Sequence, residues 1–459
     1  MLQKIKQIPS LIKQSLASTD LDFTALSINK SIVLLAIPML FEMLMESAFS
    51  IVDTFFVAKL GTEAIATVGL TESMLTIVYS IGIGISMAAT AIVARRVGEK
   101  NNEAASHAAA QAITLGVLMS LLLSCIGIVF ASDLLRMIGA SDSVVQVGTS
   151  YTQIVFGSNM VIMLLFLING IFRGAGNASL AFQSLLVANG FNILFCPLFI
   201  SMFGLNGAAI ATLCGRSLGV AFQLFHLNKK QGILQLRWSY YAPQWQSIKA
   251  ILAIAWSGTI QFIIASGSWI VLNSFMTNFG DKAVAGYTIA IRILIFFIMP
   301  AWGISNAAAT LVGQNLGAKQ PERAEQSVWQ TAKVNAMFML FVTITCLIGG
   351  KQIFALFTKD AELVATASQA LQVVSLGYVV YGIGMVILNA FNGAGDSRTP
   401  SLINFFGYWC FQIPLAWYLS HKTTLGMQGV FYSIITTEVL VMVVSAYVFK
   451  QGKWKLKQV

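Results

Sequence analysis

The chain has 459 residues, of which 57% are hydrophobic and only 10% are charged. Soluble domains carry about 25% charged residues, and a water-soluble fold of this composition would expose large apolar patches. The formal net charge of +10 could indicate nucleic-acid binding, but the basic residues lie mainly in segments between long apolar stretches. The composition therefore excludes a soluble fold and predicts an all-α integral membrane protein.

Residues 1–31 precede the first long apolar stretch. Apolar residues recur near helical spacing among lysines from Leu2 to Leu16, which favours an amphipathic helix at the membrane interface. Pro9 makes a disordered tail an equally good interpretation. No cleavable signal peptide is expected, because this segment has no continuous apolar core.

Twelve apolar segments follow, each near the length of about 20 residues that a membrane span needs. In chain order they are Ile32–Val57, Ala64–Val93, Ala104–Phe130, Gln146–Phe172, Ala178–Met202, Leu205–Phe225, Ile248–Thr277, Ala283–Val312, Val328–Ile348, Ala365–Phe391, Pro400–Ser420 and Met427–Val448.

An internal repeat divides these spans into two sets of six. At a spacing of 219 residues, Gly84-Ile85-Ser86 aligns with Gly303-Ile304-Ser305, and Gly174-Ala175-Gly176 aligns with Gly393-Ala394-Gly395. An even number of spans gives both halves the same orientation, as in transporters built from parallel repeats. We therefore expect two pseudo-symmetric six-helix lobes. The predicted parts are an N-lobe at 32–226, a cytoplasmic linker at 227–247, a C-lobe at 248–449 and a basic cytoplasmic tail at 450–459.

The basic residues also predict the topology. If the N-terminus is cytoplasmic, 20 basic residues fall on the inner side of the predicted spans and 6 on the outer side. Cytoplasmic loops carry an excess of Lys and Arg, so both termini are expected in the cytoplasm. The positive charge then marks topology and, at most, an attraction for anionic lipid.

Three acids occupy one face of the first span. At 100° per residue, Glu42, Glu46 and Asp53 lie within about 40° of one another. Charged groups inside a span are costly and are functional candidates by default, and a carboxyl there can take up and release protons. The three could carry protons, bind sodium or attract a cationic substrate; alternatively, one or more simply pairs with a basic side chain.

The second half lacks this acidic stripe, because the equivalents of Glu42 and Glu46 are Gln261 and Ala265. We therefore expect the coupling site in the N-lobe alone. Polar residues of the fourth and fifth spans are candidates for lining its cavity, although hydrogen bonding between helices is the more common role for any one of them. With Gln261, the cavity candidates are Asn169, Asn189 and Asn192.

Four further charges fall inside spans. Glu72 and Arg292 lie at similar depth on the second span of each half, and Arg216 aligns with Glu438. Either pair could bridge the lobes as a gate, while pairing within one lobe is at least as good an interpretation.

Motifs of enzymes and metal sites are missing from the sequence. There is no Walker A motif, the three histidines show no metal-ligand spacing, and the five cysteines include no C-x-x-C pair. We expect no cofactor and no metal, and a secondary transporter instead of an enzyme.

The sequence resembles the MATE (multidrug and toxic compound extrusion) family from about Ile32 to Val448. The resemblance is carried by the 6+6 repeat and by three motifs: Val52-Asp53-Thr54, Arg173-Gly174-Ala175-Gly176 and Val312-Gly313-Gln314-Asn315-Leu316-Gly317. It implies efflux of diverse, often cationic and amphiphilic compounds, driven by inward proton or sodium flow. It also implies that Asp53 is the cation-coupling aspartate, and it suggests a bacterial plasma-membrane protein that functions as a monomer.

Two features relate the chain to the branches of that family. Asn192 and Pro197 resemble part of a fifth-span Asn-x-x-x-Asp-Pro motif of the DinF-like branch, but Cys196 replaces its aspartate. The NorM-like branch has acids in the seventh and tenth spans, and this sequence has none there. The resemblance is therefore closer to the DinF-like branch, and protons are favoured over sodium as the coupling ion.

A proton-coupled exporter of organic cations is the leading hypothesis. The alternatives are a sodium-coupled exporter of the same fold and a flippase for lipid-linked or polyisoprenoid-linked cargo. A flippase for a pyrophosphate lipid should have several cations in its cavity, whereas acids outnumber arginines inside the predicted spans. A non-transporting membrane sensor is disfavoured because the sequence predicts no soluble domain.

Overall fold

The computed structural model describes all residues except 1, 18–20, 230–231 and 356–360, and every regular element of the described part is helical. The first half contains α1 (Leu2–Leu16), α2 (Ile28–Ala58), α3 (Thr62–Gly98), α4 (Asn102–Val129), α5 (Ala131–Met137), α6 (Asp142–Gly157), α7 (Asn159–Gly174), α8 (Ala178–Phe203) and α9 (Leu205–Leu227). After η1 (Trp238–Tyr241), the second half contains α10 (Trp245–Met276), η2 (Thr277–Phe279), α11 (Asp281–Gly317), α12 (Pro321–Ala355), α13 (Ala361–Ser375), α14 (Tyr378–Gly393), α15 (Arg398–Asn404), η3 (Phe405–Gln412), α16 (Ile413–His421), α17 (Met427–Lys450) and η4 (Lys453–Leu456).

The helices account for the twelve predicted spans. Among the described residues, nine helices are individually long and apolar enough to cross a membrane, and two more spans are bent helix pairs. The pair α6 and α7 bends by 41°, and the pair of α13 and α14 bends by 55°. The remaining span, predicted at Pro400–Ser420, is a continuous run of α15, the π-helix η3 and α16. The predicted all-α fold with twelve spans is confirmed, whereas the two bends and the short α5 were not predicted.

The internal repeat is also visible in the backbone. Lys100 and Lys319, which are 219 residues apart, both have a φ of 58°, a left-handed conformation that is uncommon for lysine. Gly204 and Gly426 have φ values of 59° and 55°. The helices α3 and α11 each have 37 residues, and α7 and α14 each have 16. The two lobes therefore repeat the same local conformations at the offsets found in the sequence.

Glycines bring the two lobes into close contact. A Cβ atom added at Gly98 of α3 would clash with the backbone of Gln314, and one at Gly317 of α11 would clash with the carbonyl of Arg95. These two contacts are equivalent under the repeat, because Gly98 corresponds to Gly317 and Arg95 to Gln314. The crossing of α3 and α11 is thus a pseudo-symmetric junction between the lobes.

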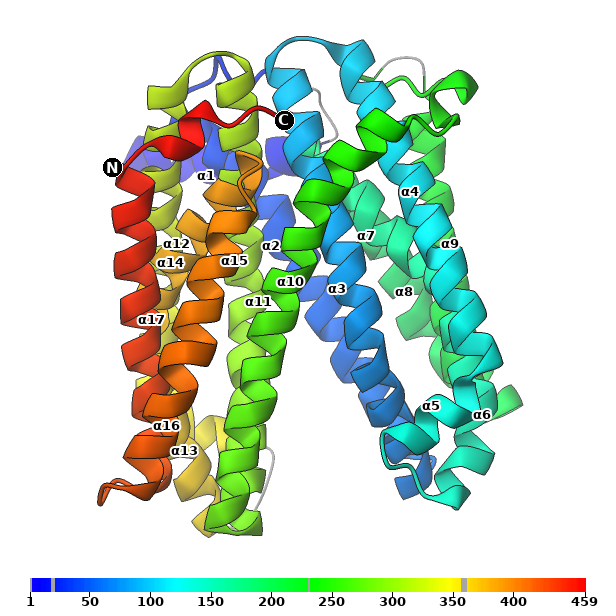
Figure 1. Ribbon diagram of the computed structural model, residues 1–459, viewed down its shortest axis with the longest axis vertical. Coiled ribbons are helices and arrows are strands. Elements are labelled where there is room, and N and C mark those ends of the chain that lie inside the picture. The colour runs from blue at the N-terminus through cyan, green and yellow to red at the C-terminus, as the bar shows by residue number, and fades with distance from the viewer. Residues whose placement is uncertain (1, 18–20, 230–231, 356–360) are drawn as a thin grey trace.

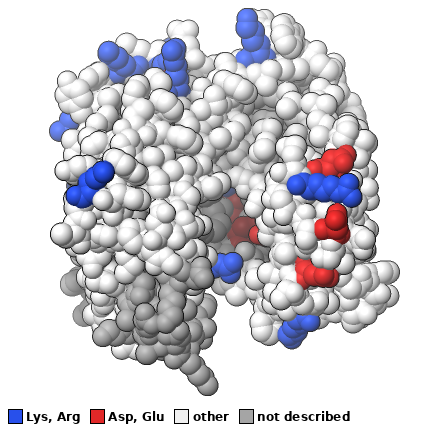
Figure 2. Space-filling model, turned by 60° about the horizontal axis from the view of Figure 1, so that its bottom comes forward, with Lys and Arg blue, Asp and Glu red and all other residues white. Residues whose placement is uncertain are grey.

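The lobes meet at one end of the molecule and separate at the other. Figure 1 shows them leaning together at the end that carries both termini and spreading apart at the end that carries α5, α6, α13 and α16. Seen from the spread end, the surface is hollowed between the lobes, with acidic side chains visible inside the hollow (Figure 2). The structure is therefore a wedge with a single open end.

The C-terminal tail reinforces the closed end. Trp454 is fully buried and stacks on Phe449 with 4.7 Å between ring centroids. Beyond it, the guanidinium of Arg96 on α3 donates a hydrogen bond of 2.5 Å to the carbonyl of Val459. The predicted basic tail thus crosses from the C-lobe to the end of α3. At the other terminus, α1 is helical through Pro9.

The lobe junction leads to a stability prediction. Gly98→Ala should destabilise the protein by about 1–3 kcal/mol, because overpacked sites force the backbones apart. The matched control is Gly69→Ala, at an exposed position of the same helix where an added Cβ meets no atom. Melting temperatures of the purified proteins in detergent provide the measurement. Equal melting temperatures for the two variants would contradict close packing at the junction.

Candidate functional site

The three acids of α2 all point toward the interior of the N-lobe. Their hydrogen-bond partners come from α7, α8 and α9, which surround this face of α2. The side chain of Glu42 is 1% exposed and that of Glu46 is 15% exposed, and Asp53 is also partly buried. The predicted common face is confirmed, but the three carboxylates have different surroundings.

Glu42 forms a buried ion pair with Arg173 of α7. One oxygen, Oε1, accepts hydrogen bonds from Arg173 Nη1 at 2.7 Å and from Asn169 Nδ2 at 3.2 Å. The other oxygen is buried without a hydrogen-bond partner. Arg173 and Asn169 are four residues apart and so lie on the same face of α7. Breaking a buried pair of this kind leaves an uncompensated charge, so this contact fixes α2 against α7.

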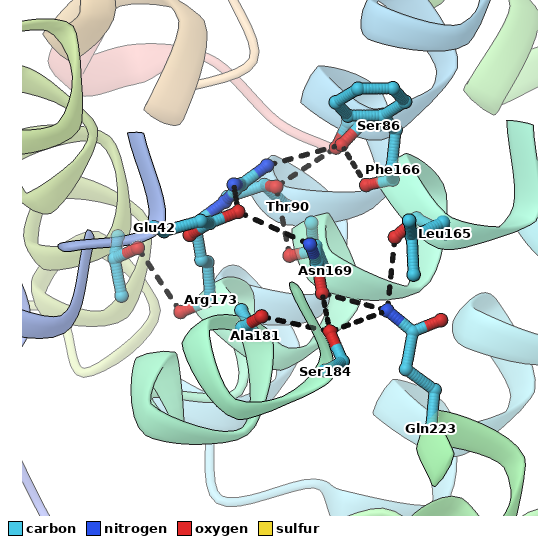
Figure 3. A network of polar contacts seen from close by, with 12 residues as sticks. Glu42, Ser86, Thr90, Leu165, Phe166, Asn169, Arg173, Ala181, Ser184 and Gln223 are labelled. Carbon is cyan, nitrogen blue, oxygen red and sulfur yellow. Dashed lines mark hydrogen bonds and ion pairs between the residues drawn. The ribbon is translucent and has the colours of Figure 1, made fainter. Parts of the chain in front are cut away.

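A network of polar side chains continues behind this pair (Figure 3). Asn169 Oδ1 accepts hydrogen bonds from Ser184 of α8 at 2.8 Å and from Gln223 of α9 at 2.7 Å. On the other side, Arg173 Nη2 lies 3.4 Å from Ser86 Oγ of α3. The network therefore joins five helices of the N-lobe through side chains that are buried or largely buried.

Glu46 forms a second ion pair, with Arg216 of α9. Glu46 Oε1 accepts a hydrogen bond of 2.9 Å from Arg216 Nη2, and Oε2 accepts one of 3.1 Å from Asn189 Nδ2. The guanidinium of Arg216 also lies 5.3 Å from the ring of Phe49 and 5.5 Å from that of Phe166, within the range of cation–π attraction. Its Nε and Nη1 atoms are buried without hydrogen-bond partners.

Asp53 differs from both glutamates. Among the described residues, its one hydrogen-bond donor is the thiol of Cys196, at 3.8 Å from sulfur to oxygen, and a thiol is a weak donor. No basic side chain of the described residues lies within 4 Å of it. Asp53 is thus the one carboxylate of the stripe whose charge has no paired counter-charge.

For Glu42 and Glu46, the structure confirms the alternative interpretation, in which an acid of the stripe pairs with a basic side chain. Arg216 lies within a predicted span, whereas Arg173 directly follows the fourth predicted span; the structure places its side chain, which is 12% exposed, beside Glu42. Its position four residues after Asn169, on the same helical face, is the sequence signal that could have identified it.

Three of the four candidate cavity residues have hydrogen-bond partners among the described side chains. Asn169 and Asn189 bind the two glutamates, and Asn192 donates to Thr212 Oγ1 at 3.0 Å. Two oxygens are buried without partners: Oδ1 of Asn192 and Oε1 of Gln261 on α10. The side-chain amides of Asn169, Asn189 and Asn192 therefore form hydrogen bonds between helices, which is the more common role of such residues.

Neither of the two candidate gate pairs forms an ion pair in this structure, and the reasons differ. Arg216 and Glu438 do not pair, because Arg216 is held by Glu46 in its own lobe and Glu438 accepts a hydrogen bond of 3.3 Å from Tyr408 within the C-lobe. Their alignment in the sequence reflects equivalent positions in separate lobes. Glu72 of α3 and Arg292 of α11 are both exposed and attract each other electrostatically, but the structure places them beyond ion-pair distance.

Both halves of the chain match one known family. The MatE family model matches residues 38–198 and 259–418. The chain belongs to the MatE family. The probable multidrug resistance protein YoeA of Bacillus subtilis (strain 168) is 26% identical to this MATE protein, over 94% of this chain and 96% of its own. The multidrug export protein MepA of Staphylococcus aureus (strain MSSA476) is 21% identical, over 90% of this chain and 91% of its own.

Solved structures show the same fold. An outward-facing conformation of a multidrug resistance MATE family transporter of the MOP superfamily is 25% identical, with a TM-score of 0.91 over 96% of this chain and 100% of that chain. A MOP superfamily transporter from Pyrococcus furiosus Vc1, described with a binding pocket of reverse polarity, is 25% identical, with a TM-score of 0.89 over 97% of this chain and 98% of that chain. This protein is therefore a multi-pass membrane transporter of the MATE family and not an enzyme.

The Glu42–Arg173 pair leads to a test of its structural role. Arg173→Gln should lower the stability by about 3–5 kcal/mol, because it leaves a buried carboxylate without a counter-charge. Combining it with Glu42→Gln should restore most of the loss, since two neutral amides can hydrogen-bond each other. Melting temperatures in detergent provide the measurement, with Arg136→Gln at an exposed position of α5 as the control. A double variant as unstable as the single one would argue against the pair.

Proposed function

We propose that this MATE protein exchanges inward-moving protons for cationic, amphiphilic organic compounds, and that Asp53 carries the proton. The observation that carries the proposal is the contrast along α2. Glu42 and Glu46 are each held by an arginine, whereas Asp53 has only a thiol beside it. A carboxylate without a fixed counter-charge can gain and lose a proton during a cycle without breaking an ion pair, whereas protonating a paired carboxylate would leave its arginine without a partner.

The immediate surroundings of Asp53 favour a proton over sodium. A hard cation is bound by several oxygen ligands, whereas in the part of the chain that the structure describes, the one polar contact of Asp53 within hydrogen-bonding distance is the sulfur of Cys196. Thiol sulfur is a soft ligand that hard cations avoid. In the Asn-x-x-x-Asp-Pro motif of the DinF-like branch, Cys196 stands in place of the aspartate. This replacement removes an oxygen ligand that a sodium site could have used.

The balance of charge supports cationic cargo. Five acids lie within the spans, and of the three arginines there, Arg173 and Arg216 are both held by carboxylates. A flippase for a pyrophosphate lipid would need several free cations to bind its headgroup. The five acids are Glu42, Glu46, Asp53, Glu72 and Glu438.

The shape of the wedge supports alternating access. We place both termini in the cytoplasm of a bacterium and the hollow on the outer side of the plasma membrane, as the distribution of basic residues predicts. Rocking of the lobes about the crossing of α3 and α11 would then open the inner end and close the outer one. The protein acts in this proposal as a monomer, with one pathway between its two lobes.

Transport in vesicles tests the role of Asp53. Ethidium efflux driven by an imposed proton gradient should fall at least tenfold in Asp53→Asn, because the amide cannot carry a proton. Asp133→Asn, at an exposed position of α5, is the matched control and should transport like the wild type. Efflux in Asp53→Asn at the wild-type rate would refute the assignment, and efflux in the wild type driven by sodium alone would refute proton coupling.

Glu42→Gln and Glu46→Gln complete this comparison. We expect both to reduce efflux by lowering the amount of folded protein, because each leaves a buried arginine without its partner. Efflux per folded molecule should therefore remain closer to the wild type than in Asp53→Asn. Full efflux per molecule in all three variants would remove the acidic stripe from the mechanism.

Glu72 and Arg292 lead to a separate prediction. They lie on the helices that cross between the lobes, and closure of the outer end could bring them into an ion pair. Glu72→Arg and Arg292→Glu should each slow efflux, and the double charge swap should restore it. Failure of the double variant to recover, with normal amounts of folded protein, would exclude a gate formed by this pair.

A further inference from the structure

The C-terminal strap, residues 453–459, is anchored in the C-lobe. Figure 1 shows it in red, running from the end of α17 toward the middle of the closed end. Trp454 is fully buried, and its indole Nε1 donates to the carbonyl of Phe449 on α17 at 2.9 Å. Lys455 pairs with Glu325 of α12 at 2.6 Å. Because both contacts are with helices of the C-lobe, this part of the strap follows the C-lobe when the lobes move.

The far end of the strap packs on a turn of the same lobe. The ammonium of Lys457 lies 3.4 Å from the carboxylate of Asp396, in the turn between α14 and α15. Gly395 of this turn has a φ of 83°, and a Cβ atom added there would clash with the side chain of Val459. The missing side chain at Gly395 therefore lets the strap lie directly on the turn.

Two arginines of α3 hold the strap from the side of the N-lobe. Arg95 Nη2 donates to the backbone carbonyl of Lys457 at 2.9 Å. Arg96 Nη2 donates to the backbone carbonyl of Val459 at 2.5 Å. Glu99, one turn farther along α3, pairs with both guanidinium groups and fixes their direction. Hydrogen bonds from a charged donor are stronger than neutral ones, and these two bind the strap to both lobes at once.

The strap is bonded next to the place where the two lobes cross. An added Cβ atom at Gly317 of α11 would clash with the backbone carbonyl of Arg95, whose side chain binds the strap. Arg95 thus belongs to the junction through its backbone and to the strap through its guanidinium. A movement that turns α3 relative to the C-lobe has to strain or break the hydrogen bonds from Arg95 and Arg96, because the strap is anchored in the C-lobe.

The arginines are not a requirement of the crossing itself. At the repeat spacing of 219 residues, Arg95, Arg96 and Glu99 correspond to Gln314, Asn315 and Ala318. The pseudo-symmetric helix α11 therefore packs at the same crossing with uncharged side chains. Basic residues on the cytoplasmic side also mark topology, but that role needs no specific contact, whereas the side chain of Arg95 is only 13% exposed and is bonded to the strap.

We propose that the C-terminal strap is a conformational latch that favours the state in which the inner end is closed. It ties α3 to the C-lobe while the wedge is open on the outer side, and its carbonyls must leave Arg95 and Arg96 before the inner end opens. The inference rests on the alternating access of the proposed function, but it holds for any cargo and for either coupling ion. The latch sets the fraction of molecules that face outward at rest.

Distances between the lobes test the latch without relying on transport. Spin labels at Asn228, which follows α9, and at Gln326 of α12, both exposed, report the separation of the inner ends by double electron–electron resonance. The purified protein has its exposed cysteines, Cys125 and Cys410, replaced by alanine. Deletion of residues 457–459 removes the hydrogen bonds to α3. It should raise the fraction of molecules with a long distance between the inner ends at least threefold.

Point variants provide the control and a second route to the answer. Gln458→Ala changes an exposed side chain of the strap and keeps its carbonyls, so it should show the wild-type distances. Arg96→Ala removes a hydrogen bond from the α3 side and should shift the distances in the same direction as the deletion, while Arg96→Lys should reverse part of that shift. Arg96→Ala decides the question if the shortened protein does not fold.

The outcomes separate a latch from a merely structural strap and from the proposed function. Wild-type distances in the deletion and in Arg96→Ala would overturn the latch, even with lowered melting temperatures, because a strap that only stabilises the fold leaves the distances unchanged. If the wild type exports ethidium under a proton gradient, that result would refute the latch alone. Shifted distances in a protein that exports no organic cation would instead support the latch and end the proposed function.

Discussion

Two carboxylate–guanidinium pairs, buried in the apolar interior of the N-lobe, determine where α2 can lie. Glu42 and Glu46 are one turn apart, and their arginines come from two different helices, α7 and α9. Because neither charge can be left alone in a low-dielectric interior without a large penalty, α2 is held in one rotation about its axis. That rotation also directs Asp53, two turns farther along, toward Cys196 and the interior of the lobe.

The different roles of the three acids follow from this constraint on α2. The two paired glutamates contribute to the position of α2, and the unpaired Asp53 is left free to change its charge. Polar groups buried in a membrane protein are costly, and the network behind Glu42 satisfies most of them through Asn169, Ser184 and Gln223. The half of α2 that is held by two ion pairs thus supports a second half in which Asp53 can gain and lose a proton.

Much of this architecture could be predicted from the sequence, because it depends on periodicity. The acidic face of α2 follows from 3.6 residues per turn, and the pseudo-symmetric crossing at Gly98 and Gly317 follows from the 219-residue offset. The partners of the acids could not be predicted in this way. Arg173 and Arg216 are more than a hundred residues from the glutamates that bind them, and only the packing of α2, α7, α8 and α9 together in the N-lobe brings them close. The π-helix that places Tyr408 beside Glu438 likewise has no periodic signal.

The central claim is that Asp53 is the carboxylate that releases a proton when a cationic substrate binds. The most direct measurement is proton release on addition of ethidium to the purified protein in lightly buffered detergent, followed with a pH indicator. The account predicts release by the wild type and none by Asp53→Asn at matched occupancy of ethidium. Equal release from both proteins would show that the proton comes from another group and would contradict the account.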